Sequence, residues 1–241
     1  MTDIAIALVG LDHWYSAIPL AEGVSQRPGV CLAGIWDRHP QRAEQIASRL
    51  SVDRVERDWR ALVEDPDVDA VLSFVSLDEN PEVCIAAAKV GKHIIANKPL
   101  ARSLDEATAV VNAVRESGVH LLPAECRQRL GPRLEFLRRW FDEGRLGRLE
   151  SASMVCWAGL PQQWPDDTKP GWFADPARTA GGAWIDHAIY QVDLLRWVFG
   201  EEVASVSGHV ANLRHPGLTV EDFGVATVVL SGGAVATLEC T

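Results

Sequence analysis

The first half of the chain alternates short apolar runs with helical patterns, and this alternation is the feature that most constrains the fold. Continuous apolar strands that alternate with helices are typical of a parallel sheet covered by helices on both faces. We expect strands at residues 4–10, 30–36, 69–75, 92–96 and 119–122, and helices at residues 40–50, 82–90 and 104–117.

The character of the sequence changes near Arg148. A Pro-, Gly- and Trp-rich stretch at 160–176 and a long helix at 183–199 are followed by strand patterns, with Ser231-Gly232-Gly233 predicting a hairpin turn between the last two. This half is expected to be α+β with a mostly antiparallel sheet. The expected strands are residues 150–157, 203–213, 223–230 and 234–240.

Composition excludes several classes of protein. The formal net charge of −10 over 241 residues argues against a nucleic-acid binder, which needs a basic face. Five scattered cysteines without a CxxC pair, and histidines without ligand spacing, predict free thiols in a reducing cytoplasm and no metal site. The start of the chain does not resemble a signal peptide, and no apolar segment has membrane-spanning length, so we expect no membrane partner.

Ligands of open parallel sheets bind beyond the carboxyl ends of the strands, so the residues after each strand are candidates. After the first strand, the G-x-G-x-x-G phosphate loop is reduced to Gly10-Leu11-Asp12-His13-Trp14-Tyr15. Asp12 replaces the glycine that lets the backbone meet the pyrophosphate, and its carboxylate would repel phosphates unless it turns away. The first turn of the following helix could still attract an anion.

Asp37 ends the second strand, 22 residues beyond Tyr15, which is where a carboxylate that binds the ribose 2′-hydroxyl is expected. Such a carboxylate favours NAD, whereas the neighbouring Arg38 could pair with the 2′-phosphate of NADP. The alternative is that Asp37 only caps the helix starting near Pro40. In the loop after the third strand, Asp78 or Asn80 is expected to cap the helix at Glu82.

Lys98 follows the fourth strand directly and precedes Pro99. A lysine ammonium there could donate to a substrate hydroxyl and stabilise the developing alkoxide, although most lysines are solvated surface residues. In the long helix, Asp186 and Tyr190 share one face, which is either part of a site or an ordinary solvated face. The Trp-rich loop could stack on sugar rings or pack on the sheet; its tryptophans are Trp157, Trp164 and Trp172.

Three segments together resemble one known family, the Gfo/Idh/MocA oxidoreductases. Residues 87–101, which read A-A-K-V-G-K-H-I-I-A-N-K-P-L-A, resemble its A-G-K-H and E-K-P-L-A block. Residues 129–132 with 143–147 resemble its R-F-x-P and S-G-x-I-G stretches. Residues 181–197 resemble its G-G-x-L-x-D-x-G-x-H-x-x-D-L-x-x-W helix, and the similarity covers essentially the whole chain.

The resemblance implies a Rossmann domain at 1–123 and a substrate and oligomerisation domain at 124–241 with an open, mostly antiparallel sheet that would form a homo-oligomer. It implies hydride transfer between NAD or NADP and a sugar, polyol or related alcohol. Its catalytic residues map to Lys98, Asp186 and Tyr190, where Tyr190 stands for the usual histidine, accepts the hydroxyl proton and has its pKa lowered by Lys98. The expected cofactor-binding residues are Gly10, Leu11, Asp12, Asp37, Arg38, Val75 and Asn97, and the expected substrate-binding residues are Arg129, His187 and Trp172.

The sequence also departs from the family pattern. Asp12 and Tyr15 degrade the glycine loop, Asn97 replaces the glutamate of E-K-P, and residues 75–80 replace T-P-N-x-x-H. The chain also ends inside an expected sheet, which predicts either a fragment or an edge covered by a partner subunit. These departures leave two alternatives open: a non-catalytic sugar- or nucleotide-binding relative, and a lyase or glycosidase that uses NAD transiently.

Overall fold

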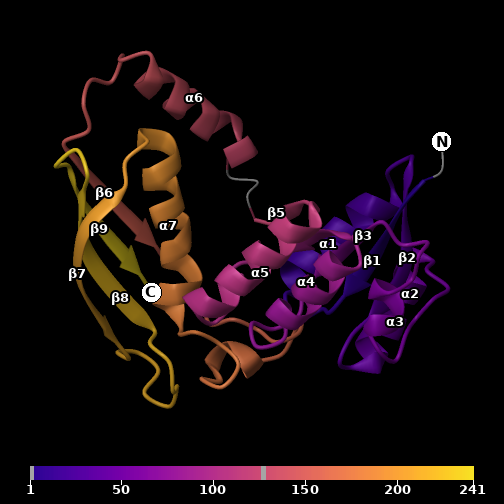
Figure 1. Cartoon of the computed structure of the whole chain (residues 1–241). Coiled ribbons are helices and arrows are strands. Elements are labelled where there is room, and N and C mark those ends of the chain that lie inside the picture. Colours follow the sequence, from indigo (N-terminus) through magenta and orange to yellow (C-terminus); the bar gives the residue numbers. More distant parts are fainter. Residues whose placement is uncertain (1–2, 126–128) are drawn as a thin grey trace. The chain divides into compact units, whose positions relative to one another are not determined.

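The computed structural model describes residues 3–125 and 129–241, and the chain divides into two compact units (Figure 1). The first unit consists of the chain up to Glu125 together with Gln162–Thr168, and the second unit consists of residues 126–161 and 169–241. The sequence pattern did not predict that Gln162–Thr168 belongs with the first unit. None of the described helices is both long and apolar enough to cross a membrane.

The first unit contains the predicted parallel sheet, with the strand order β2-β1-β3-β4-β5. All four neighbouring pairs are parallel, and this confirms the Rossmann-type architecture expected from the alternating pattern. The carboxyl ends of the strands therefore share one edge, where the candidate loops follow. The strands are β1 (Ile4–Val9), β2 (Val30–Trp36), β3 (Ala70–Ser73), β4 (His93–Ala96) and β5 (Leu121–Pro123).

Helices cover both faces of this sheet because side chains alternate along each strand. Ile6 and Leu8 of β1 pack with buried residues of α1 and α2, whereas Ala7 and Val9 pack with those of α3, α4 and α5. Two apolar cores result, one on each face. The helices are α1 (Trp14–Ser25), α2 (Pro40–Leu50), α3 (Arg60–Val63), α4 (Asn80–Lys89) and α5 (Leu104–Ser117).

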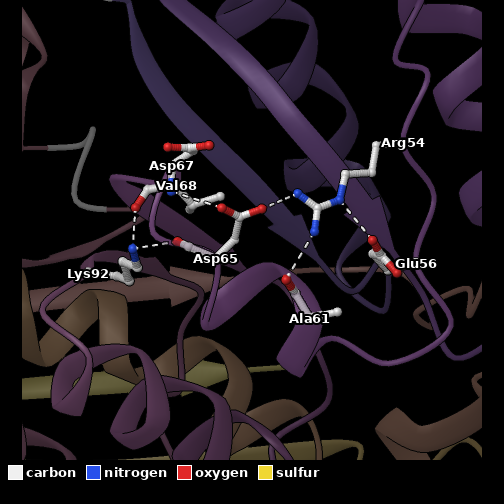
Figure 2. A network of polar contacts seen from close by, with 7 residues as sticks. All are labelled: Arg54, Glu56, Ala61, Asp65, Asp67, Val68 and Lys92. Atoms are coloured by element: carbon white, nitrogen blue, oxygen red, sulfur yellow. Dashed lines mark hydrogen bonds and ion pairs between the residues drawn. The ribbon is translucent and has the colours of Figure 1, made fainter.

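A polar network fastens the segment that leads into β3 (Figure 2). The buried Lys92 ammonium donates to the carbonyl oxygens of Asp65, at 2.7 Å, and Val68, at 2.5 Å. The Arg54 guanidinium binds the Asp65 carboxylate, and the hydrogen bond and charge of Arg54 hold the pKa of Asp65 below its usual value. Lys92, which belongs to the G-K-H part of the motif, is therefore a structural residue.

The second unit contains a four-stranded sheet with the order β6-β9-β8-β7. β6 runs parallel to β9, while the other two pairs are antiparallel, so the sheet is mixed and mostly antiparallel as expected. α7 packs against one face of this sheet, over a core around Leu195 and Leu238 (Figure 1). The elements are α6 (Pro132–Asp142), β6 (Ser151–Cys156), the 3-10 helix η2 (Gly171–Ala174), α7 (Ala183–Phe199), β7 (Val203–Ala211), β8 (Phe223–Leu230) and β9 (Val235–Cys240).

Candidate functional site

The loop after β1 depends on its one remaining glycine. Gly10 has φ +88°, and a Cβ at this position would lie 2.5 Å from Val75 Cγ1, so no larger residue fits without a shift. Asp12 is buried, and its Oδ2 accepts a hydrogen bond of 2.9 Å from the backbone N–H of Ser76. The carboxylate that replaces the second glycine is thus bonded to the loop after β3. It therefore turns away from the place where phosphates were expected, as the sequence analysis required.

Asp37 lies at the end of β2 with both carboxylate oxygens bonded to the backbone. Oδ2 accepts from Leu11 N at 2.7 Å and Oδ1 from His39 N at 2.8 Å. The residue is 4% exposed, and burial raises the pKa of its carboxyl although the hydrogen bond from His39 acts against this shift. Each oxygen keeps further acceptor capacity, so Asp37 can both hold the first loop and accept a hydroxyl.

Arg38 has a carboxylate partner within the same unit. Its guanidinium forms an ion pair with Glu79, the residue that immediately precedes α4. Burial lowers the pKa of Arg38, but the hydrogen bond and charge of Glu79 outweigh this effect and the pKa lies above its usual value. The cation expected for a 2′-phosphate is therefore already paired.

Asn80 bridges two strand ends, and the expectation that it caps a helix at Glu82 is wrong. α4 begins at Asn80 itself. Its N-cap residue is Glu79, whose side chain forms no capping hydrogen bond. The Asn80 side chain, 2% exposed, accepts from Ser73 Oγ at 2.7 Å and donates to Leu100 O at 2.7 Å. It thereby joins the end of β3 to the segment just after Lys98.

The other candidate cap is also occupied elsewhere. Asp78 Oδ1 accepts a hydrogen bond of 2.6 Å from Ser76 Oγ, so its carboxylate closes a turn within the loop. A short polar loop before a helix suggests capping from sequence alone, because the sequence does not show which other group each side chain binds, here Ser76 for Asp78.

Lys98 is the second residue after β4 and is 8% exposed, which excludes an ordinary solvated lysine. The Lys98–Pro99 peptide is cis. The adjacent Asn97 is 4% exposed; its Nδ2 lies 2.6 Å from His13 Nδ1 and donates to Lys98 O at 3.3 Å. Among the described residues, Asn97 Oδ1 has no hydrogen-bond partner although it is buried.

Sequence reasoning missed His13 as a residue of this edge. The ring is 1% exposed, and Nδ1 lies 3.0 Å from the Tyr15 hydroxyl as well as close to Asn97. His13 thus connects the first loop to the segment that carries Lys98. The available signal was its place three residues after Gly10, the glycine that follows the first strand.

In the second unit, the first turns of α7 gather three polar side chains. Gly182 is required before the helix, because a Cβ there would lie 1.9 Å from the carbonyl oxygen of Glu221. Asp186 Oδ2 lies 3.3 Å from His187 Nδ1, and the rings of His187 and Tyr190 have centroids 6.3 Å apart. All three side chains are partly exposed, so a carboxylate, an imidazole and a phenol are available to a ligand.

The two remaining substrate candidates have structural partners. Arg129 binds the Asp193 carboxylate through two nitrogens, and its guanidinium lies 5.9 Å from the centre of the Trp197 ring. Trp172 is 4% exposed and stacks on Phe173 with ring centroids 4.0 Å apart. These contacts favour packing roles, and the predicted substrate contacts of both residues stay predictions.

The carboxyl edge of the first sheet fits a dinucleotide. Gly10 carries no Cβ where the loop after β1 begins, and the loop runs into α1, whose first N–H groups attract anions. Asp37 and the buried, unpartnered Asn97 Oδ1 are acceptors for hydroxyl or amide donors. A nucleotide offers such donors on its ribose rings and its carboxamide.

Comparison with known proteins agrees with this geometry. Residues 4–124 match the family model described as "Oxidoreductase family, NAD-binding Rossmann fold". Residues 134–241 match the "GFO/IDH/MocA C-terminal domain". The first unit therefore carries an NAD-binding Rossmann fold.

Among curated proteins, the chain is 31% identical over 215 residues to scyllo-inositol 2-dehydrogenase (NAD(+)) of Bacillus subtilis strain 168, covering 88% of this chain and 59% of that enzyme. It is also 31% identical over 170 residues to levoglucosan dehydrogenase of Pseudarthrobacter phenanthrenivorans, covering 69% of this chain and 42% of that enzyme. A solved structure of levoglucosan dehydrogenase in complex with NADH and L-sorbose has a TM-score of 0.84 and 26% identity, covering 99% of this chain and 66% of that one.

The chain spans less than two thirds of the length of these relatives. The two family models nevertheless cover nearly all of it, and the first alone matches half of its residues. The chain therefore belongs to the Gfo/Idh/MocA family of oxidoreductases.

Proposed function

We propose that this protein is a dehydrogenase that transfers a hydride between a nicotinamide cofactor and a CH–OH group of a sugar, polyol or inositol-like alcohol. The observation that carries the proposal is the burial of Lys98 at the carboxyl end of β4, beside the unpartnered Asn97 Oδ1. Inositol and levoglucosan dehydrogenases among the relatives support the same substrate class.

The proposed chemical roles fall on Lys98, Asp186 and Tyr190. When bound, the nicotinamide would supply the carbon that exchanges hydride with the substrate. Lys98 donates a hydrogen bond to the substrate oxygen and stabilises its developing negative charge. Tyr190 takes the hydroxyl proton, and Asp186 orients the polar groups at the start of α7.

Residues of the first unit would hold the cofactor. The backbone at Gly10 and Leu11 and the first turn of α1 are assigned to the phosphates, and Val75 and Asn97 to the nicotinamide half. Asp37 is assigned to the adenosine ribose, which makes NAD the preferred cofactor. Asp12 supports this arrangement because its carboxylate is already bonded to Ser76 N.

Cofactor binding and turnover provide separate tests. NADH at 100 times its Kd should stabilise the protein by about 2.7 kcal/mol, which thermal unfolding detects. Lys98→Ala should reduce kcat by about 100-fold or more with inositols or levoglucosan, while the Kd for NADH changes little. Lys89→Ala, on the exposed end of α4, serves as the control. Full turnover by the Lys98→Ala variant would end the proposed mechanism.

We also propose a homo-oligomer formed through the second sheet. Along β7, every residue from Val203 to Val210 is exposed, including Val206 at 64% and Val210 at 51%, so the described part of the chain leaves this strand uncovered. Light scattering after size exclusion tests the assembly, and substituting Val206 with Asp should lower the mass. A monomer at micromolar concentration would contradict this part of the proposal.

A further inference from the structure

Arg38 occupies the place from which a dinucleotide site distinguishes NADP from NAD. It directly follows Asp37 at the end of β2, where a carboxylate binds the 2′-hydroxyl and a nearby arginine accommodates the 2′-phosphate. The sequence therefore presents both recognition elements side by side. Which cofactor is selected depends on whether the Arg38 charge is available.

Glu79 engages that charge. The Arg38 and Glu79 side chains form an ion pair, and they are only 39% and 33% exposed. Two further carboxylates, Asp12 and Asp78, also act on the Arg38 guanidinium through their charges. Three carboxylates thus act on the Arg38 cation, and a 2′-phosphate would have to compete with them for it.

The loop after β3 holds Glu79 in place. The backbone N–H of Glu79 donates to Ser76 O at 3.1 Å, and the backbone N–H of Ser76 in turn donates to Asp12 Oδ2. The Glu79 carboxylate is therefore positioned by the loop that also fixes Asp12, and a phosphate would have to displace it from Arg38.

The second oxygen of Glu79 offers nothing to a phosphate. Oε2 is buried and has no hydrogen-bond partner among the described residues. As a carboxylate oxygen it only accepts hydrogen bonds, so it cannot donate one to a phosphate. The same side chain thus occupies the partner of a 2′-phosphate and supplies no donor in its place.

We propose that Glu79 determines the cofactor preference of this protein, by pairing with Arg38 so that NAD binds and NADP is rejected. The inference rests on the proposed dehydrogenase function. It assigns specificity to a residue more than 40 positions after the Asp37-Arg38 pair, in a different loop of the same sheet edge.

The test is the ratio of the Kd values for NADPH and NADH, measured by titration calorimetry on the whole chain. The wild-type protein should bind NADH at least tenfold more tightly than NADPH. Glu79→Gln keeps the size of the side chain but removes its charge, and it should tighten NADPH binding about tenfold, equivalent to ~1.4 kcal/mol. The Kd for NADH should change less than threefold.

Two controls define the mechanism. Glu82→Gln removes an exposed carboxylate of α4 that pairs with Arg60 instead, and it should leave the ratio unchanged. Adding Arg38→Gln to Glu79→Gln should abolish the gain for NADPH, because the released guanidinium is its source. An unchanged ratio in Glu79→Gln, with NADH still bound, would overturn the role of Glu79 alone. Binding of neither cofactor by the wild type would overturn the proposed function as well.

Discussion

At the scale of single residues, the proposed cofactor site at the carboxyl edge of the first sheet depends on Gly10, a position where the backbone accepts only glycine. For Gly10→Ala, the new Cβ would lie 2.7 Å from Val75 N, in a backbone conformation with positive φ. We expect unfolding free energy to fall by about 1–3 kcal/mol and NADH affinity to fall with it. Urea unfolding and cofactor titration measure the two effects.

Gly23 provides a control, because its replacement by alanine is not expected to lower the stability of the protein. Gly23 lies within α1, and apart from its chain neighbours and the backbone of its own helix no atom lies within 4 Å of the Cβ that alanine would add. Gly23→Ala should therefore leave stability unchanged or raise it by up to ~1 kcal/mol. Equal behaviour of the two variants would contradict the requirement for glycine after β1.

Side-chain partners were the part of the site that sequence could not predict. Asp12 was expected to repel phosphates unless its carboxylate turned away, and sequence could not show that this carboxylate accepts from the N–H of Ser76, 64 positions away. Asn80 was expected to cap a helix, yet it bonds to Ser73 and Leu100. The strand-end positions follow from periodicity, whereas these contacts depend on how neighbouring strands align.

At the scale of elements, the loop between β7 and β8 is organised by Asp222. Its carboxylate, 8% exposed, accepts from the backbone N–H groups of Leu213, Arg214 and His215 and contacts the His215 ring. Burial acts to raise the pKa of Asp222, but these hydrogen bonds outweigh it and hold the pKa at about 2.

This low pKa gives the loop a defined pH dependence. The folded value lies below the unfolded value, so the stabilisation is complete above pH ~4 and is lost as pH falls toward 2. Asp222→Asn should destabilise the second unit by about 1–3 kcal/mol at pH 7, and the difference from wild type should shrink at pH 2–3. Urea unfolding at several pH values checks this; a difference independent of pH would refute it.

The turn before β3 depends on Lys92. Lys92→Met would keep the apolar stem but leave the carbonyl oxygens of Asp65 and Val68 without their donor, as Figure 2 shows. We expect a loss of about 1–3 kcal/mol in urea unfolding. Lys89→Met, at the exposed end of α4, should change stability by less than ~0.5 kcal/mol. Similar losses of unfolding free energy in both variants would contradict the structural role of the Lys92 ammonium.

The elements themselves were largely predictable. Every predicted strand has its counterpart, and α2, α5 and α7 occupy the predicted residues, because their apolar periodicity continues over several turns. α3 was not predicted because four residues give no periodicity. α6 was not predicted either, and the structure buries none of its side chains.

At the scale of the whole molecule, the Trp-rich stretch does not act as one loop. Gln162–Thr168 belongs to the first unit: Trp14 Nε1 donates to Gln162 O at 2.9 Å, and the Arg42 guanidinium lies 4.6 Å from the centre of the Trp164 ring. Trp164 also packs against one of the two apolar cores of that unit. The chain therefore leaves the first unit and returns to it before α7 begins.

This return should contribute to the stability of the first unit. Trp164→Ala removes a large ring that is only partly buried, so the expected loss is about 1–3 kcal/mol, below the range for a fully buried tryptophan. Trp157 is 78% exposed, and Trp157→Ala should change stability by less than ~0.5 kcal/mol. Urea unfolding of both variants, with NADH titration alongside, measures the effect. Equal stability of the two variants would mean that Gln162–Thr168 does not stabilise the first unit.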